Sequence, residues 1–155
     1  MRIQELMSSP VATCHPGDPA HTAAQLMWDN DCGVIPVVDD AGKLVGVITD
    51  RDICMAAYTQ GNPLRAIRVD NAMAKQVFSL HPEDDVSEAE KLMSDKQVRR
   101  IPVVDAEGKP VGVLSLNDLA REAVGPGGRI REGMTKVMQT MASICRPRSR
   151  ALKAA

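Results

Sequence analysis

The sequence predicts an α+β protein made of two β-α-β-β-α repeats that pack as a pseudo-two-fold pair, followed by an amphipathic C-terminal helix. Three observations support this fold class. The chain aligns with itself at an offset of 66 residues, which places Ile35 on Ile101. Helical and strand-like apolar patterns follow one another in the same order in both copies. Residues 125–155 differ from both copies in charge and periodicity. We therefore expect a first domain at 1–62, a second at 63–124 and a tail at 125–155.

The internal duplication runs along both copies without a gap. Its longest identical stretch is Ile-Pro-Val-Val-Asp, at 35–39 and again at 101–105. Further identities at this offset are Met7 with Met73, His15-Pro16 with His81-Pro82, Leu26-Met27 with Leu92-Met93, Gly42-Lys43 with Gly108-Lys109, Val45-Gly46-Val47 with Val111-Gly112-Val113, and Asp52 with Asp118. A fixed repeat of this kind indicates two copies of one structural unit. The copies are joined around Gly61-Asn62-Pro63, which reads as a turn or loop.

Each copy is expected to begin with a short strand followed by a helix. In the first copy the strand lies near Val11–Cys14, and Asp18 before Pro19 places a capping residue ahead of a helix that ends near Asp31. The second copy repeats this order, with a strand near 77–80 and a helix over about 84–97.

A hairpin and a second helix complete each copy. In the first copy the strands are 34–38 and 44–48, and the helix follows from Thr49. In the second copy the strands are 101–105 and 110–115, and the helix covers 115–124. One such unit cannot cover both faces of its small sheet, so we expect the copies to pack sheet to sheet with helices outside.

The tail combines an amphipathic helix with a basic end. Apolar residues at helical spacing predict a helix that ends before Pro147: Ile130, Met134, Val137, Met138, Met141, Ile144 and Cys145. Residues 1–124 hold 12 basic and 19 acidic residues, whereas 125–155 hold 7 and 1. The helix either straps the body or binds a partner, and the basic tail suits an acidic surface, which the body, a partner or nucleic acid would provide.

Composition excludes several classes of protein. The aromatic residues Trp28, Tyr58 and Phe78 are too few for a base-stacking surface. No apolar run suggests a spanning helix or a signal peptide, so we expect a cytoplasmic protein that does not enter the membrane. The four cysteines form no CxxC pair, and we expect reduced, mostly buried thiols.

Neither a metal site nor a catalytic centre is expected. His15, His21 and His81 match no metal-ligand spacing with Cys14, and His15 and His81 suit turns before their helices. None of the histidines lies near a repeated hydroxyl, and the chain has neither a P-loop nor a GxGxxG turn. We predict that the protein is not an enzyme and carries no cofactor.

Each second strand runs into its helix through a hydroxyl that is followed three residues later by a carboxylate. The pairs are Thr49 with Asp52, and Ser115 with Asp118. One interpretation is a capping box, in which both side chains satisfy the helix N-terminus. The other is a nucleotide site, because a helix N-terminus binds phosphate and an acid holds the hydroxyls of ribose. The glycine that precedes each pair permits close approach of a ligand or a neighbouring backbone.

The whole pattern resembles the CBS domain, and two such domains in tandem resemble a Bateman module, as in stand-alone bacterial CBS-pair proteins such as hypoxic response proteins. The resemblance rests on Ile-Pro-Val-Val-Asp, Gly-Lys and Gly-x-x-Thr/Ser-x-x-Asp, and covers residues 1 to about 124. It implies that Thr49 and Ser115 contact phosphate and that Asp52 and Asp118 hold ribose. Adenine would lie beside Val47 or Val113.

The same resemblance implies that each site borrows residues from the other copy. Thr49 and Asp52 would face Val98, Arg99 and Arg100. Ser115 and Asp118 would face Cys32, Gly33 and Val34. Because guanidiniums bind phosphate strongly, we expect the first site to fill first and to prefer ligands with more phosphates.

The sequence therefore predicts a regulatory module that senses an adenine nucleotide or adenosyl compound, such as AMP, ADP, ATP, S-adenosylmethionine or NAD, and signals to a protein partner or through its dimer. Homodimerisation is expected through small apolar residues on the helices that follow each hairpin: Ile53, Ala56, Ala57, Leu119, Ala120, Ala123 and Val124. Two alternatives stay open. One is a redox or metal sensor that uses the cysteines, and the other is a DNA-associated regulator that binds weakly through the tail, although nucleic acid is not the favoured partner.

Overall fold

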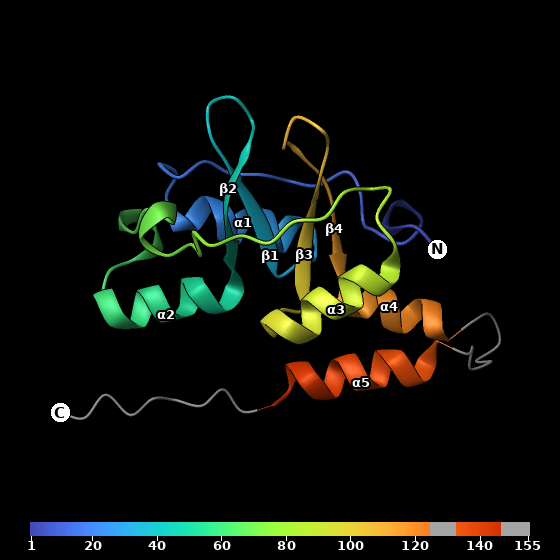
Figure 1. The fold of residues 1–155 in the computed structure, drawn as a ribbon. Coiled ribbons are helices and arrows are strands. Elements are labelled where there is room, and N and C mark those ends of the chain that lie inside the picture. Colours follow the sequence, from blue (N-terminus) through green and yellow to red (C-terminus); the bar gives the residue numbers. More distant parts are fainter. Residues whose placement is uncertain (125–132, 147–155) are drawn as a thin grey trace.

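The computed structural model describes residues 1–124 and 133–146, so the predictions for Ile130 and for the basic end at 147–155 lie outside the described residues. Figure 1 shows two hairpins side by side, with helices around them. The first repeat contains α1 (Ala20–Asp29), β1 (Val34–Val38), β2 (Leu44–Thr49) and α2 (Asp50–Gln60). The second contains α3 (Val86–Lys96), β3 (Arg100–Val104), β4 (Pro110–Ser115) and α4 (Leu116–Ala123), and α5 (Met134–Ile144) follows. Short 3₁₀ turns occupy Ile3–Glu5, Leu64–Ala66 and Val69–Asn71.

The two hairpins have the same register, as the duplication predicts. Ile35 pairs with Ile48 in the first hairpin, and Ile101 pairs with Leu114 in the second. β1 is buried along its whole length, which explains why its sequence is continuously apolar rather than alternating. The tips of the hairpins contact one another, because the Leu44 amide donates to the Gly108 carbonyl at 3.0 Å. The expected α+β fold with two packed repeats is confirmed.

The expected leading strands do not form. Cys14 and Leu80 each make a single parallel bridge, to Val37 and Val103, while the residues before them have no regular structure. Only one residue of each segment therefore joins its sheet, and the rest connects the repeats along the surface.

The segments that precede these bridges are exchanged between the repeats. Ser8 makes two backbone hydrogen bonds with Val113 of β4, at 2.9 and 3.1 Å. Ala74 makes the equivalent pair with Val47 of β2. Ile3 consequently belongs to the core of the second repeat, whereas Val69 belongs to the core of the first. The leading segment of each repeat therefore packs on the other repeat and not on the one that it precedes in the sequence.

This exchange explains the glycine in each repeated motif. A Cβ on Gly46 would lie 2.6 Å from the sulfur of Met73, and a Cβ on Gly112 would lie 2.6 Å from the sulfur of Met7. The close approach comes from the exchanged segment of the other repeat and not from a ligand.

The turns before α1 and α3 correct one expectation about helix capping. The carboxylate of Asp18 accepts from the His15 amide at 2.8 Å, so Pro19, without a capping side chain, is the N-cap of α1. Asp84 accepts in the same way from His81, and Asp85 then caps α3 by accepting from the Ser87 amide. His15 and His81 lie in these turns, as expected.

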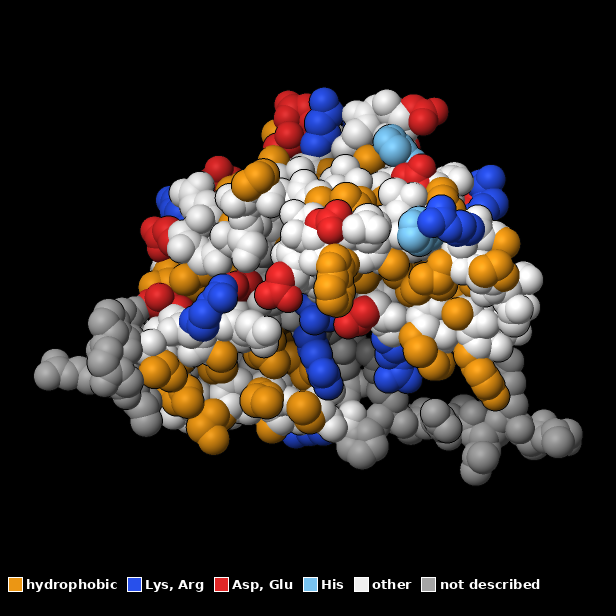
Figure 2. Space-filling view, turned by 180° about the vertical axis from the view of Figure 1, so that it is seen from behind, with side chains coloured by type: hydrophobic (Ala, Val, Ile, Leu, Met, Phe, Trp, Pro, Cys, Tyr) orange, Lys and Arg blue, Asp and Glu red, His pale blue; other side chains and the backbone are white. Residues whose placement is uncertain are grey.

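α5 packs on α3 and α4 and covers one side of the second repeat (Figure 1). Its inner face consists of Val137, Thr140 and Ile144. Met138 and Met141, which the apolar pattern had placed on that face, are exposed. The helix is therefore confirmed as an amphipathic strap, but its buried stripe excludes two of the methionines. Figure 2 shows hydrophobic side chains gathered along the lower edge of the molecule, on the side of α5.

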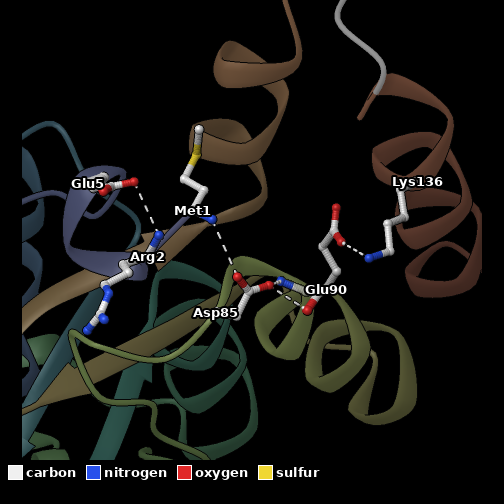
Figure 3. A network of polar contacts seen from close by, with 7 residues as sticks. Met1, Arg2, Glu5, Asp85, Glu90 and Lys136 are labelled. Atoms are coloured by element: carbon white, nitrogen blue, oxygen red, sulfur yellow. Dashed lines mark hydrogen bonds and ion pairs between the residues drawn. The ribbon is translucent and has the colours of Figure 1, made fainter.

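Polar contacts fix both ends of the strap and the first residues of the chain. Lys136 of α5 pairs with the buried carboxylate of Glu90 on α3, with 3.1 Å between Nζ and Oε2. The Met1 amino group points to Asp85 at the start of α3, and Figure 3 shows both contacts converging on this helix. The Gln97 side chain donates to the carbonyls of Ser143 and Arg146 at the end of α5.

Candidate functional site

A cavity of about 300 Å³ lies between the repeats, at the N-terminus of α4. This volume is in the range of small-molecule sites. One wall consists of the loop after Ser8 and the start of β1. The opposite wall consists of β4 and the first turns of α4. The lining residues are Ser8, Pro10, Val11, Ala12, Asn30, Asp31, Cys32, Gly33, Val34, Ile35, Arg100, Val113, Ser115, Asn117, Asp118 and Arg121.

The structure therefore brings together the second set of residues that the sequence singled out. Ser115, Asp118 and Val113 line the cavity with Cys32, Gly33 and Val34 from the other repeat. Val113 stands in this wall because β4 ends there, and Ser115 is the N-cap of α4.

The capping interpretation of the repeated motif is correct for both helices. The Ser115 amide donates to Asp118 Oδ2 at 2.7 Å, and the Asp118 amide donates to Ser115 Oγ at 3.3 Å. Thr49 and Asp52 make the equivalent bonds at 2.9 and 3.2 Å. Each hydroxyl also donates to the same carboxylate oxygen. Capping uses only one oxygen of each carboxylate, so it leaves the other oxygen for a second role.

The second oxygen distinguishes the two repeats. Asp118 is 5% exposed, and its Oδ1 accepts from the guanidinium of Arg121, one turn further along α4. The residue at the equivalent position of α2 is Met55, which offers no donor to Asp52. The two repeats therefore differ in the residue one turn beyond the capping acid, which is arginine in the second repeat and methionine in the first.

Of the two arginines that the sequence placed at the first site, Arg100 lies between the repeats and lines pockets at the starts of both α2 and α4. Arg100 pairs with Ser115 across the hairpin and lines the cavity at α4, together with Arg121. Its Nη2 atom lies 2.9 Å from the point where a Cβ on Gly33 would stand. Glycine at this position leaves room for the guanidinium, and the Asp50 carboxylate at the start of α2 lies 3.0 Å from the same point. Arg100 also lines a second pocket with Asp50 and Ile53 of α2.

The other residues expected at the first site are not gathered into this cavity. Thr49, Asp52 and Val47 lie at the end of β2 and the start of α2, outside its lining. Val98 packs against the core of the second repeat. Arg99 is exposed, and its carbonyl accepts from the Leu116 amide.

The start of α2 also carries a negative charge that α4 lacks. Asp50 is the first residue of α2, and its carboxylate accepts from the Arg51 amide at 2.8 Å. Leu116 holds the equivalent position in α4. A carboxylate at a helix N-terminus competes with a phosphate for the same amides and repels it, so the start of α4 is the better anion site.

The cysteines are more exposed than expected. Cys14 is buried at 2% exposure, and burial raises its pKa to about 12. Cys32, Cys54 and Cys145 are exposed, and the expectation of mostly buried thiols is therefore wrong. Each lies at or just beyond the end of an element or on an outer helix face, where core packing does not reach. Within residues 1–124 and 133–146, no group of three His, Cys, Asp or Glu side chains is placed to hold a metal ion.

Comparison with known proteins identifies the repeats. The family model described as "CBS domain" matches twice, at residues 3–58 and 67–125. The chain belongs to the CBS-domain family. The matched segments are the two repeats described above, so the structure is a CBS pair followed by α5.

Curated relatives include a CBS domain-containing protein, YhcV, of Bacillus subtilis. It is 36% identical over 118 residues, which cover 76% of this chain and 82% of the relative. The same pair also forms part of longer proteins. A homoserine O-acetyltransferase of Methanococcoides burtonii is 29% identical over 119 residues, which are 77% of this chain but 23% of that protein.

Solved structures of CBS pairs have the same fold. The CBS domain pair of protein MJ0100, in complex with 5′-methylthioadenosine and S-adenosyl-L-methionine, gives a TM-score of 0.72 at 27% identity and covers 79% of this chain and 94% of that chain. The CBS domain structure NE2398 gives a TM-score of 0.73 at 29% identity, with coverage of 81% and 98%. In the part of this CBS pair that the structure describes, none of the helices is long and apolar enough to cross a membrane.

Sequence reasoning missed several residues of the cavity. Arg121 was not predicted because the repeated motif ends at Asp118. The alignment at offset 66 does show that the first repeat has Met55 at the equivalent position. The loop from Ser8 to Ala12 carries no motif. It reaches the cavity only because the leading segments are exchanged.

Proposed function

We propose that this CBS pair binds an adenosine-containing ligand in the cavity at α4 and that occupancy of this cavity is the signal that the protein senses. One observation carries the proposal. The cavity sets an apolar wall from one repeat opposite a helix N-terminus with a buried carboxylate from the other. Such a surface complements a flat apolar base that is joined to a polyhydroxyl group.

Each part of the ligand has a complementary group. The adenine ring would lie between Val113 and the apolar side chains of Val11 and Ile35. The ribose hydroxyls would donate to the side chain of Asp118, which is almost fully buried. A group on the 5′ carbon would then lie at the start of α4, near Arg100 and Arg121. The adenosyl ligands of the related pair of MJ0100 support this class of ligand.

Binding is tested with a panel of adenosine, AMP, ADP, ATP, 5′-methylthioadenosine and S-adenosylmethionine. A ligand that binds only the folded state raises the melting temperature. We expect at least one member to do so, and calorimetry to give one strong site per chain. If no member of the panel binds at millimolar concentration, the cavity does not recognise adenosine.

We also propose that two copies associate through the outer face of α1 and α2. The corresponding face of the second repeat is closed, because α5 buries Leu119 and Ala123, which the sequence had placed in a dimer contact. Trp28 and Tyr58 on α1 and α2 are 85% and 82% exposed. Large exposed aromatic side chains are typical of a contact surface. A second chain that meets this face would connect ligand binding to assembly.

A further inference from the structure

We infer that Arg121 is a specificity-determining residue that makes the cavity select adenosine ligands with a phosphate. The inference rests on the proposed function and adds the charge of the ligand. In the structure the Arg121 guanidinium donates to Asp118 Oδ1, the carboxylate oxygen that takes no part in capping. A ligand gains full use of Asp118 only if it offers Arg121 another anion.

The acceptor sites on Asp118 are limited. Its Oδ2 accepts from both the amide and the hydroxyl of Ser115. A carboxylate oxygen has about two lone-pair sites, so Oδ2 is fully engaged. Oδ1 keeps one acceptor site beside Arg121, which suffices for one ribose hydroxyl but not for two. Recognition of both hydroxyls therefore requires Arg121 to leave.

Arg121 is placed to make this exchange. Its side chain is 74% exposed, whereas the side chain of Asp118 is 4% exposed. The acid is thus held in place by its surroundings, while the guanidinium can turn about its flexible stem. Both residues line the cavity together with Ser115 and Asn117, which stand at the start of α4. A phosphate at this N-terminus lies within reach of Arg121 and makes charge-assisted, bidentate hydrogen bonds with it.

The first repeat supports the assignment by contrast. It has Met55 in place of Arg121 and Asp50 in place of Leu116, so it lacks a cation one turn beyond its acid and carries one more carboxylate at the helix start. Both differences, a lost arginine and an added carboxylate, disfavour a phosphate at the start of α2. Phosphate selection is consequently a property of the second repeat.

The experiment compares AMP with adenosine by calorimetry in the wild type and in Arg121→Met, which installs the residue of the first repeat. Loss of Arg121 frees Asp118 and removes a phosphate contact. We therefore expect adenosine to bind more tightly and AMP more weakly, so that the preference for AMP falls by about tenfold or more. Arg51→Met removes another exposed charge, from α2, and should leave the preference unchanged.

A structural role for Arg121 would weaken both ligands alike and leave the ratio unchanged, and that result would overturn the inference. An Arg121→Lys variant keeps the charge but loses the bidentate geometry, so it should retain part of the preference for AMP; a larger loss than in Arg121→Met would contradict the inference. If wild type binds adenosine and AMP equally, Arg121 does not select phosphate although the proposed site stands. If wild type binds neither, the proposed function fails as well.

Discussion

The equivalence of Asp118 and Asp52 allows the ligand role of an acid to be separated from its capping role. Asp118→Ala removes a capping box and the acceptor for ribose. Loss of the cap costs about 1 kcal/mol of unfolding free energy. The ion pair with the largely exposed Arg121 adds about 0–1 kcal/mol. Hydrogen bonds to a charged acceptor contribute about 1.5–3 kcal/mol. We therefore expect calorimetry to show that AMP binds roughly 10- to 150-fold more weakly.

Asp52→Ala is the matched control, because the same capping bonds are lost outside the cavity. We expect it to lower the free energy of unfolding by about 1 kcal/mol in urea, as for Asp118→Ala, and to leave AMP affinity within about twofold of wild type. Equal losses of affinity in both variants would mean that the acids act on binding only through stability. Loss in Asp52→Ala alone would move the ligand to the first repeat.

Three further predictions follow from the packing. Lys136→Met leaves the buried Glu90 carboxylate without its ion pair, and should lower the free energy of unfolding by about 1 kcal/mol in urea, whereas Lys136→Arg should not. Combined Trp28→Ser and Tyr58→Ser should convert a dimer to a monomer in sedimentation at tens of micromolar, and a wild type that is monomeric there would exclude this interface. Cys14 should resist iodoacetamide at about pH 8 in the folded protein, because its raised pKa keeps the thiol protonated, and rapid alkylation would contradict its burial.

The repeat and the local patterns predicted most of the fold, because each element is determined largely by nearby residues. The strands at 34–38 and 110–115 match their predicted bounds, and Thr49 and Ser115 begin their helices as N-caps. The leading strands failed because their pairing depends on the path of the chain. Val11 to Cys14 has strand-like residues, but the segment crosses between repeats and touches its sheet at one point.

The site was predicted only as far as the motif extends. Ser115, Asp118 and their facing residues Cys32 to Val34 meet in one cavity, and Arg100 lines this cavity as well as a pocket at the start of α2. The direction of a long side chain depends on the space around it, and here the missing side chain of Gly33 determines that space. The buried face of α5 could not be predicted either: Thr140 is buried and Met141 is exposed, because the apolar pattern does not say which side of the helix meets α3 and α4.

The central claim is that the ligand lies in the cavity at α4, and the exposed cysteines allow a direct test. Cys32 lines this cavity, while Cys54 on α2 and Cys145 after α5 do not. Alkylation rates of the three thiols are measured by mass spectrometry with and without saturating AMP. The account predicts that AMP slows alkylation of Cys32 and leaves Cys54 and Cys145 unchanged. Binding of AMP with an unchanged rate at Cys32 would contradict it.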